Sequence, residues 1–183
     1  MEKIISKSFL NDVFSSDKVS DSIINEAKSA RMRVSGYDQI TVFLSHKHDE
    51  TNVLGQVVKL LKTIGVNVYI DWLDEGMPKL TSGVTAVKIK DKINKCQKFI
   101  LIATEAAISS KWCNWELGLG DAKKYPQNIA IIPISENRST SWSGSEYMQI
   151  YPIITSEYEY TKGQFFVEFQ NSKITLADWL KRR

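Results

Sequence analysis

The sequence has few cysteines, no excess of charge of one sign and no long apolar run. Two cysteines in 183 residues, Cys96 and Cys113, match no metal-binding spacing and are typical of a reducing compartment. A net charge of +3 is too small to indicate nucleic acid or an anionic membrane as a partner. No segment approaches the ~18 apolar residues that cross a bilayer, and Met1 to Leu10 do not form a signal peptide. We therefore expect a cytoplasmic protein with no membrane or nucleic-acid partner.

Length and composition indicate one globular domain with a short appendage. Hydrophobic content of 43% and charged content of 25% are ordinary for such a protein. Residues 1–36 are predicted to form a helical N-terminal extension, and residues 37–183 the domain. The densest basic stretch is interrupted by Asp91 and by isoleucines, which predicts the solvated face of a helix. Its lysines are Lys88, Lys90, Lys92, Lys95 and Lys98.

Apolar segments of strand length alternate with segments of helical spacing. The strand segments are apolar throughout, which is typical of strands buried on both faces of a parallel sheet. The sequence therefore predicts an α/β fold with a doubly wound parallel sheet. Strands are expected at 40–44, 66–70, 99–103 and 129–134, with edge strands at 149–154 and 164–169. Helices are expected at 53–64, at 83–95 with Val84, Val87 and Ile89 inward, from about 111 to 124, and after a cap at Thr175.

Glu116 is a carboxylate inside an apolar helical stripe. Its neighbours three and four positions away are Trp112, Cys113, Leu119 and Gly120, none of which can pair a carboxylate. Burial of an unpaired carboxylate costs several kcal/mol. Glu116 is therefore a candidate functional group, and a glutamate at the helix rim that reaches water is the ordinary alternative.

Polar residues follow the predicted strands at the edge where parallel sheets bind ligands. Ser45 and His46 follow the first strand, and Asp71 and Trp72 follow the second. In a 2-1-3-4-5 strand order, the first and third strands flank the point where the order reverses. Ser45, His46 and Glu116 should then converge on one cleft, with Asp71 and Trp72 beside it.

Several other chemistries fit these residues poorly. His46 and His48 have no third metal ligand at a suitable spacing, so we predict no metal site. Adjacent strand residues point to opposite faces, which disfavours a Ser45–His46 nucleophile pair. Gly118 and Gly120 lie inside a helix and cannot cradle phosphates. A phospho-receiver domain would need an aspartate at Thr104.

A lone carboxylate near indoles suits a substrate with a cationic aromatic leaving group. Nicotinamide in NAD is such a group, because it departs neutral and requires no general acid, unlike the leaving groups of two-carboxylate glycosidases. Glu116 could stabilise the oxocarbenium ion that develops. Trp72 or Trp112 could stack on a substrate ring, whereas core packing is favoured for Trp115.

Several motifs resemble the Toll/interleukin-1 receptor (TIR) family, in order, between residues 37 and 183. Residues 40–46, Ile-Thr-Val-Phe-Leu-Ser-His, resemble its first motif. Residues 110–118, Ser-Lys-Trp-Cys-Asn-Trp-Glu-Leu-Gly, are similar to the tryptophan–glutamate helix of its bacterial members. Segments 131–134 and 151–154 also match the family in position.

The resemblance implies a flavodoxin-like fold and cleavage of NAD+ to nicotinamide and ADP-ribose or a cyclic relative. NAD+ would be the substrate, with no cofactor. The catalytic glutamate falls on Glu116, and the substrate-lining positions fall on Ser45, His46, Trp112 and the loop from Asp71 to Lys79. Stand-alone bacterial members often act in anti-phage defence of the Thoeris type, where the cyclic product activates a separate effector. TIR–TIR assembly is also implied.

Two alternatives remain at this stage. A non-catalytic TIR–TIR signalling module would leave NAD+ intact. Animal receptor domains carry Arg-Asp-Pro-Gly in the loop after the second strand, and residues 74–79 read Asp-Glu-Gly-Met-Pro-Lys instead, which weakens this alternative. An enzyme resembling nucleoside deoxyribosyltransferases would prefer deoxynucleosides to NAD+. The sequence does not distinguish hydrolysis from cyclisation, since water and an adenine nitrogen can attack the same oxocarbenium species.

Overall fold

The computed structural model describes residues 2–14, 40–70, 82–124, 126–137, 141–142, 144–157 and 164–182. Three predicted site residues, Asp71, Trp72 and Lys79, lie outside these ranges. The same is true of residues 15–39, which contain the predicted boundary between the N-terminal extension and the domain.

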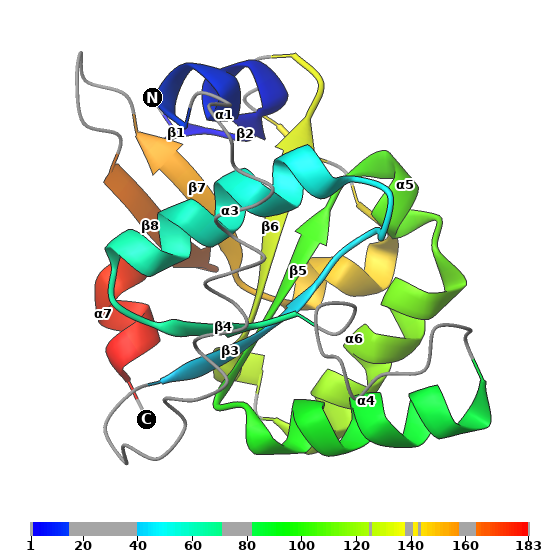
Figure 1. The fold of residues 1–183 in the computed structure, drawn as a ribbon. Coiled ribbons are helices and arrows are strands. Elements are labelled where there is room, and N and C mark those ends of the chain that lie inside the picture. The colour runs from blue at the N-terminus through cyan, green and yellow to red at the C-terminus, as the bar shows by residue number, and fades with distance from the viewer. Residues whose placement is uncertain are drawn as a thin grey trace.

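A mostly parallel sheet forms the centre of the fold (Figure 1). Its order is β4-β3-β5-β6-β7-β8-β9, and the pairs from β4 to β7 are parallel. Counted along the chain from β3, these five strands follow the order 2-1-3-4-5, so the predicted fold class is confirmed. Strands β8 and β9 extend the sheet in antiparallel register beyond β7. The strands are β3 (Thr41–Ser45), β4 (Asn67–Tyr69), β5 (Lys98–Ala103), β6 (Ile129–Ser135), β7 (Ile153–Glu157), β8 (Gln164–Phe169) and β9 (Ser172–Thr175).

Helices cover both faces of the sheet. Side chains of β3 alternate between two apolar clusters: Val42 and Leu44 belong to the cluster under α3, and Phe43 belongs to the cluster under α4 and α6. This alternation explains why the strands read as continuous apolar runs, since neither face meets water. Figure 1 shows α3 on the other side of β3 from α4 and α6. The helices are α3 (Thr51–Thr63), α4 (Gly83–Lys95), α5 (Glu105–Ile108), α6 (Lys111–Lys123) and α7 (Leu176–Lys181), with 3-10 turns at Pro126–Asn128 and Glu146–Ile150.

The N-terminal residues differ from the predicted helical extension. Strand β1 (Glu2–Lys3) pairs with β7, and strand β2 (Ile5–Ser6) pairs with β6, before helix α1 (Lys7–Val13) begins. Ile4 and Ile5 are buried, and Ser6 caps α1 by accepting a hydrogen bond from the backbone N–H of Phe9. The start of the chain is therefore part of the sheet, and only α1 matches the expected helix.

The inward face of α4 was predicted wrongly. Val84 and Val87 are 59% and 69% exposed, whereas the buried residues are Thr85, Ile89 and Ile93. These three are spaced four apart, so they form one stripe, and Val87 lies about 200° around the helix from Ile89. The helix bounds at Gly83 and Lys95 are as predicted.

Two other predictions, on Lys98 and on the edge strand at 149–154, are also wrong. Lys98 is not on a helix surface: it is the first residue of β5 and only 2% exposed. The edge strand expected at 149–154 begins instead at Ile153, after the 3-10 turn that ends at Ile150. The strand at 164–169 and the Thr175 cap are confirmed.

Gly120 allows α6 to pack closely on β5. A Cβ atom added there would lie 3.1 Å from the ring of Phe99, which is itself stacked on Phe43 with centroids 5.5 Å apart. A Cβ atom at Gly118 would meet nothing within 4 Å. We expect G118A to raise the free energy of unfolding by about 1 kcal/mol, through helix propensity. We expect G120A to lower it by about 1 kcal/mol, because overpacking outweighs that gain. Urea denaturation of both variants measures the difference, and equal stabilisation by both would contradict the packing argument.

Candidate active site

Glu116 is buried and held by a hydroxyl from another element. Its side chain is 2% exposed, and Ser45 Oγ donates a hydrogen bond to Glu116 Oε2 at 2.6 Å. Ser45 is the last residue of β3, and Glu116 lies in α6, 71 positions later. The predicted convergence of these two residues is confirmed, and the alternative of a glutamate that reaches water at the helix rim is wrong.

His46 lies beside this pair and makes a second contact between β3 and α6. Cys113 Sγ donates to the backbone oxygen of His46 at 3.3 Å. The His46 side chain is buried, with Nδ1 3.1 Å from the backbone oxygen of Leu44. Cys113 and Glu116 are three positions apart on α6 and contact the consecutive residues His46 and Ser45. The end of β3 is therefore fixed to α6 at two points.

Local sequence explains why α6 presents Glu116 to the sheet. Ser110 caps the helix by accepting from the backbone N–H of Cys113 at 3.4 Å. Leu117 is buried in the cluster under α4 and α6, and Gly120 contacts Phe99. Helix packing thus places Glu116 at a buried position, where a carboxylate requires hydrogen-bond donors.

Two tryptophans of α6, which precede Glu116 in the sequence, stack on each other. The rings of Trp112 and Trp115 have centroids 4.9 Å apart and an angle of 20° between their planes. Both are half-buried and pack against the apolar cluster, as expected for Trp115. Trp112 Nε1 is buried and has no hydrogen-bond acceptor among the residues that the structure describes. Such a donor is costly to leave unpaired, which makes it a candidate contact for a substrate oxygen.

A polar network at the same edge of the sheet was not predicted. Thr104, which follows β5, donates to the carboxylate of Glu50, and Glu50 lies 3.7 Å from Lys7 Nζ. Lys7 also pairs with Glu136 at 2.6 Å, and this hydrogen bond is the main reason that the pKa of Lys7 is raised. The network ties α1 to the ends of β5 and β6. Thr104 at a strand end was visible in the sequence, but its partner from the start of α3 was not.

The remaining site predictions are not tested by the structure. Asp71, Trp72 and Lys79 lie outside the described residues. Within the described segments, no group of three or more histidine, cysteine or acidic residues could hold a metal ion. Among these segments, no helix combines the length and the apolarity that crossing a bilayer requires.

A family match agrees with the fold and spans the residues of this site. A family model described as "TIR domain" matches residues 42–159, a range that includes Ser45 and Glu116. A protein from Bacillus cereus (strain MSX-D12), named "Probable 3' cyclic ADP-D-ribose synthase ThsB'", is 29% identical over 145 residues. The alignment covers 77% of this chain and 72% of that protein. A "Putative cyclic ADP-D-ribose synthase TIR2" from Cytobacillus dafuensis is 25% identical over 79 residues, which are 42% of this chain and 21% of that protein.

Proposed function

This chain belongs to the TIR domain family, and from that premise we propose that it cleaves the nicotinamide–ribose bond of NAD+ and forms a cyclic ADP-ribose. The main support for the proposal is the buried carboxylate of Glu116, which accepts a hydrogen bond from the Ser45 hydroxyl. The pair lies at the carboxyl end of β3, the edge at which parallel sheets bind ligands. Two relatives named as cyclic ADP-D-ribose synthases support the proposal.

In the proposed reaction, the bond between ribose C1′ and the nicotinamide nitrogen breaks. Its electron pair goes to the nitrogen, so nicotinamide leaves neutral and positive charge develops on the ribose. Glu116 stabilises that charge, and an electrostatic contact of this kind is typically worth about 3–4 kcal/mol. Because Ser45 already orients the carboxylate, little reorganisation is needed when the charge develops.

The other site residues receive substrate-binding roles in this proposal. Trp112 stacks on a substrate ring, and its buried Nε1 donates to a substrate oxygen once the ring is bound. His46 contacts ribose or phosphate oxygens. The loop residues Asp71, Trp72 and Lys79 complete the binding surface. NAD+ is the substrate, and no further cofactor is required.

The second half of the reaction decides the product. Attack on C1′ by water, with loss of a proton, gives ADP-ribose. Attack by a nucleophile of the adenosine half gives a cyclic isomer, which we favour because of the names of the relatives. We propose that this product is a signal in bacterial anti-phage defence, read by a separate effector, and that the chain self-associates through TIR–TIR contacts when active.

Mass spectrometry of the products of NAD+ tests the function directly. Purified protein, at increasing concentration to promote self-association, is incubated with NAD+, and nicotinamide, ADP-ribose and cyclic isomers are quantified. We expect nicotinamide in equal amount to the sum of the other products, with a cyclic isomer predominant. NAD+ that stays intact at every concentration, and with extract of infected cells added, would refute the enzyme and favour a non-catalytic interaction module.

The two stacked tryptophans provide a matched test of substrate binding. We expect W112L to raise the KM for NAD+ on the order of tenfold, because base stacking on an aromatic side chain is worth about 1–3 kcal/mol. The control W115L removes a half-buried indole from the same helix and should leave KM within about twofold of wild type. Initial rates of nicotinamide release over a range of NAD+ concentrations give both values. Equal increases in KM would show that the two indoles act only in packing.

A further inference from the structure

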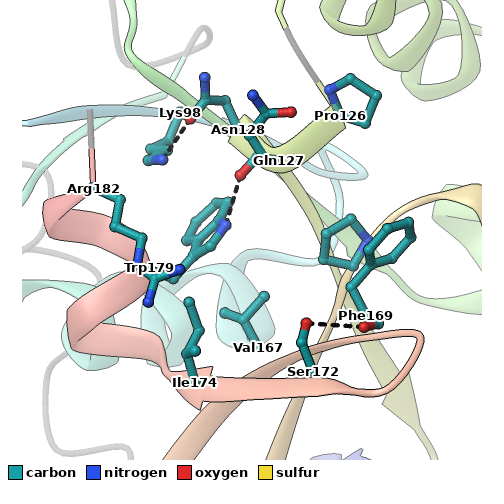
Figure 2. Close-up of a pocket in the computed structure, with 11 residues that line it drawn as sticks. Lys98, Pro126, Gln127, Asn128, Val167, Phe169, Ser172, Ile174, Trp179 and Arg182 are labelled. Carbon is teal, nitrogen blue, oxygen red and sulfur yellow. Dashed lines mark hydrogen bonds between the residues drawn. The ribbon is translucent and has the colours of Figure 1, made fainter.

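A cavity of about 300 Å³ lies near the amino end of β5, and Figure 2 shows the residues that line it. Its walls come from the start of β5, the 3-10 turn before β6, the hairpin of β8 and β9, and α7. Glu116 contacts Ser45 at the carboxyl end of β3, whereas Lys98 stands at the amino end of the neighbouring parallel strand β5. Ser45, which holds Glu116, is in register with Leu101 of β5, three residues and roughly 10 Å along the strand from Lys98. Neither Ser45 nor Glu116 lines the cavity, so the cavity is separate from the proposed active site.

Lys98 is a buried ammonium at the wall of the cavity. It is 2% exposed, Nζ donates to Asn128 Oδ1 at 2.5 Å, and Nζ lies 4.7 Å from the centroid of the Trp179 ring. An ammonium carries three donors, and Asn128 is a neutral acceptor for one of them. Among the described residues, no carboxylate lies within ion-pair distance of Lys98. Its charge is therefore buried without a described counter-charge, which is costly unless an anion binds.

Arg182 adds a second positive charge to the same wall. Burial, and to a smaller extent the charge of Arg182, lower the pKa of Lys98 to about 8. Lys98 is thus still mostly protonated at neutral pH, and the two cations repel each other. A bound anion would offset the repulsion between the two cations and accept the remaining hydrogen bonds of the Lys98 ammonium.

The other side of the cavity carries apolar side chains, among them Phe169 and Pro126. Figure 2 shows Phe169 and Pro126 across from Lys98 and Arg182. Trp179 forms the wall between them, and its indole nitrogen is already used, because Nε1 donates to the backbone oxygen of Gln127 at 2.8 Å. The indole therefore offers a ring face. The cavity combines two cations with aromatic and proline surfaces.

We propose that this cavity binds a small organic anion with a planar ring, of about the size of a mononucleotide. Its anionic group contacts Lys98 and Arg182, and its ring packs against Phe169 and Pro126. The volume is at the lower end of that of small-molecule sites, which are mostly apolar with a few placed polar groups. This site is independent of the proposed reaction at Glu116.

Isothermal titration calorimetry of the full chain tests the proposal, with adenosine 5′-monophosphate as the probe. Adenosine carries the same ring without the charge, and inorganic phosphate carries the charge without the ring. We expect the monophosphate to bind and both fragments to bind at least about tenfold more weakly, because each lacks one set of contacts. K98M and R182Q should each weaken the monophosphate about tenfold or more, whereas W112L, the variant expected to weaken NAD+ binding at the proposed active site, should leave its affinity unchanged.

The variants also separate binding from folding. Methionine has nearly the shape of lysine and removes a buried charge, so K98M should melt at or above the wild-type temperature. Arg182 is exposed, so R182Q tests the same contact without a change in the core. An affinity that is the same in K98M, R182Q and wild type would overturn the proposal. Equal affinity for adenosine, loss of binding in W112L, or no binding of the monophosphate at millimolar concentration would overturn it as well.

Discussion

Replacing Glu116 with glutamine is expected to lower the rate of nicotinamide release on the order of a thousandfold. Glutamine keeps the shape of the side chain and can still accept the Ser45 hydrogen bond through its amide oxygen, but it removes the negative charge. Because the charge is used only when the ribose becomes cationic, kcat should fall and KM should change little. Release of nicotinamide from NAD+, followed by chromatography, measures the loss.

Stability distinguishes this loss of charge from a loss of structure. Glu116 is 2% exposed, so its carboxylate is desolvated in the folded protein and exposed to water in the unfolded one. Glutamine keeps the volume of the side chain and the acceptor for Ser45 Oγ, so we expect E116Q to stay folded, with a melting temperature close to that of the wild type. E105Q is a matched control, because Glu105 is an exposed carboxylate on α5. A wild-type rate in E116Q would refute the assignment of the catalytic carboxylate.

The centre of the sheet could be predicted because strands β3, β5 and β6 are buried on both faces. Residues 98–103 of β5 are all buried, and the corresponding sequence is an apolar run after a single lysine. The two-residue strands β1 and β2 are too short to show a period, and they pair with β7 and β6 from far along the chain. Only the tertiary fold decides that residues 2–6 join the sheet.

The proposed active site was visible in the sequence for a topological reason. The carboxyl ends of parallel strands meet at one edge, so Ser45 and the helix after β5 had to come together once the strand order was known. Lys98 shows the limit of this approach. It follows four lysines of α4 in the sequence, but its burial depends on Asn128 and on Trp179 of α7, which are distant in the sequence. No local pattern predicts such a contact.

Replacing Ser45 with alanine is expected to lower kcat by about tenfold to a hundredfold and to destabilise the protein. Ser45 donates to a buried carboxylate, and a hydrogen bond to a charged group is worth about 1.5–3 kcal/mol. Without it, the carboxylate is less well oriented toward the ribose and less well solvated by the protein. Both the rate of nicotinamide release and the melting temperature should therefore fall. S172A is a control at an exposed serine near the far edge of the sheet, and it should keep the wild-type rate.

The effect of Ser45 should depend on the charge at position 116, because Ser45 acts through Glu116. In the E116Q background, S45A should change the residual rate by less than about twofold, since the charge that the hydroxyl orients is absent. The destabilisation should also be smaller, because an uncharged amide is less costly to leave without a donor than a carboxylate. If S45A lowered the rate equally in both backgrounds, Ser45 would contact the substrate directly, and the 2.6 Å hydrogen bond would not be the route by which it contributes.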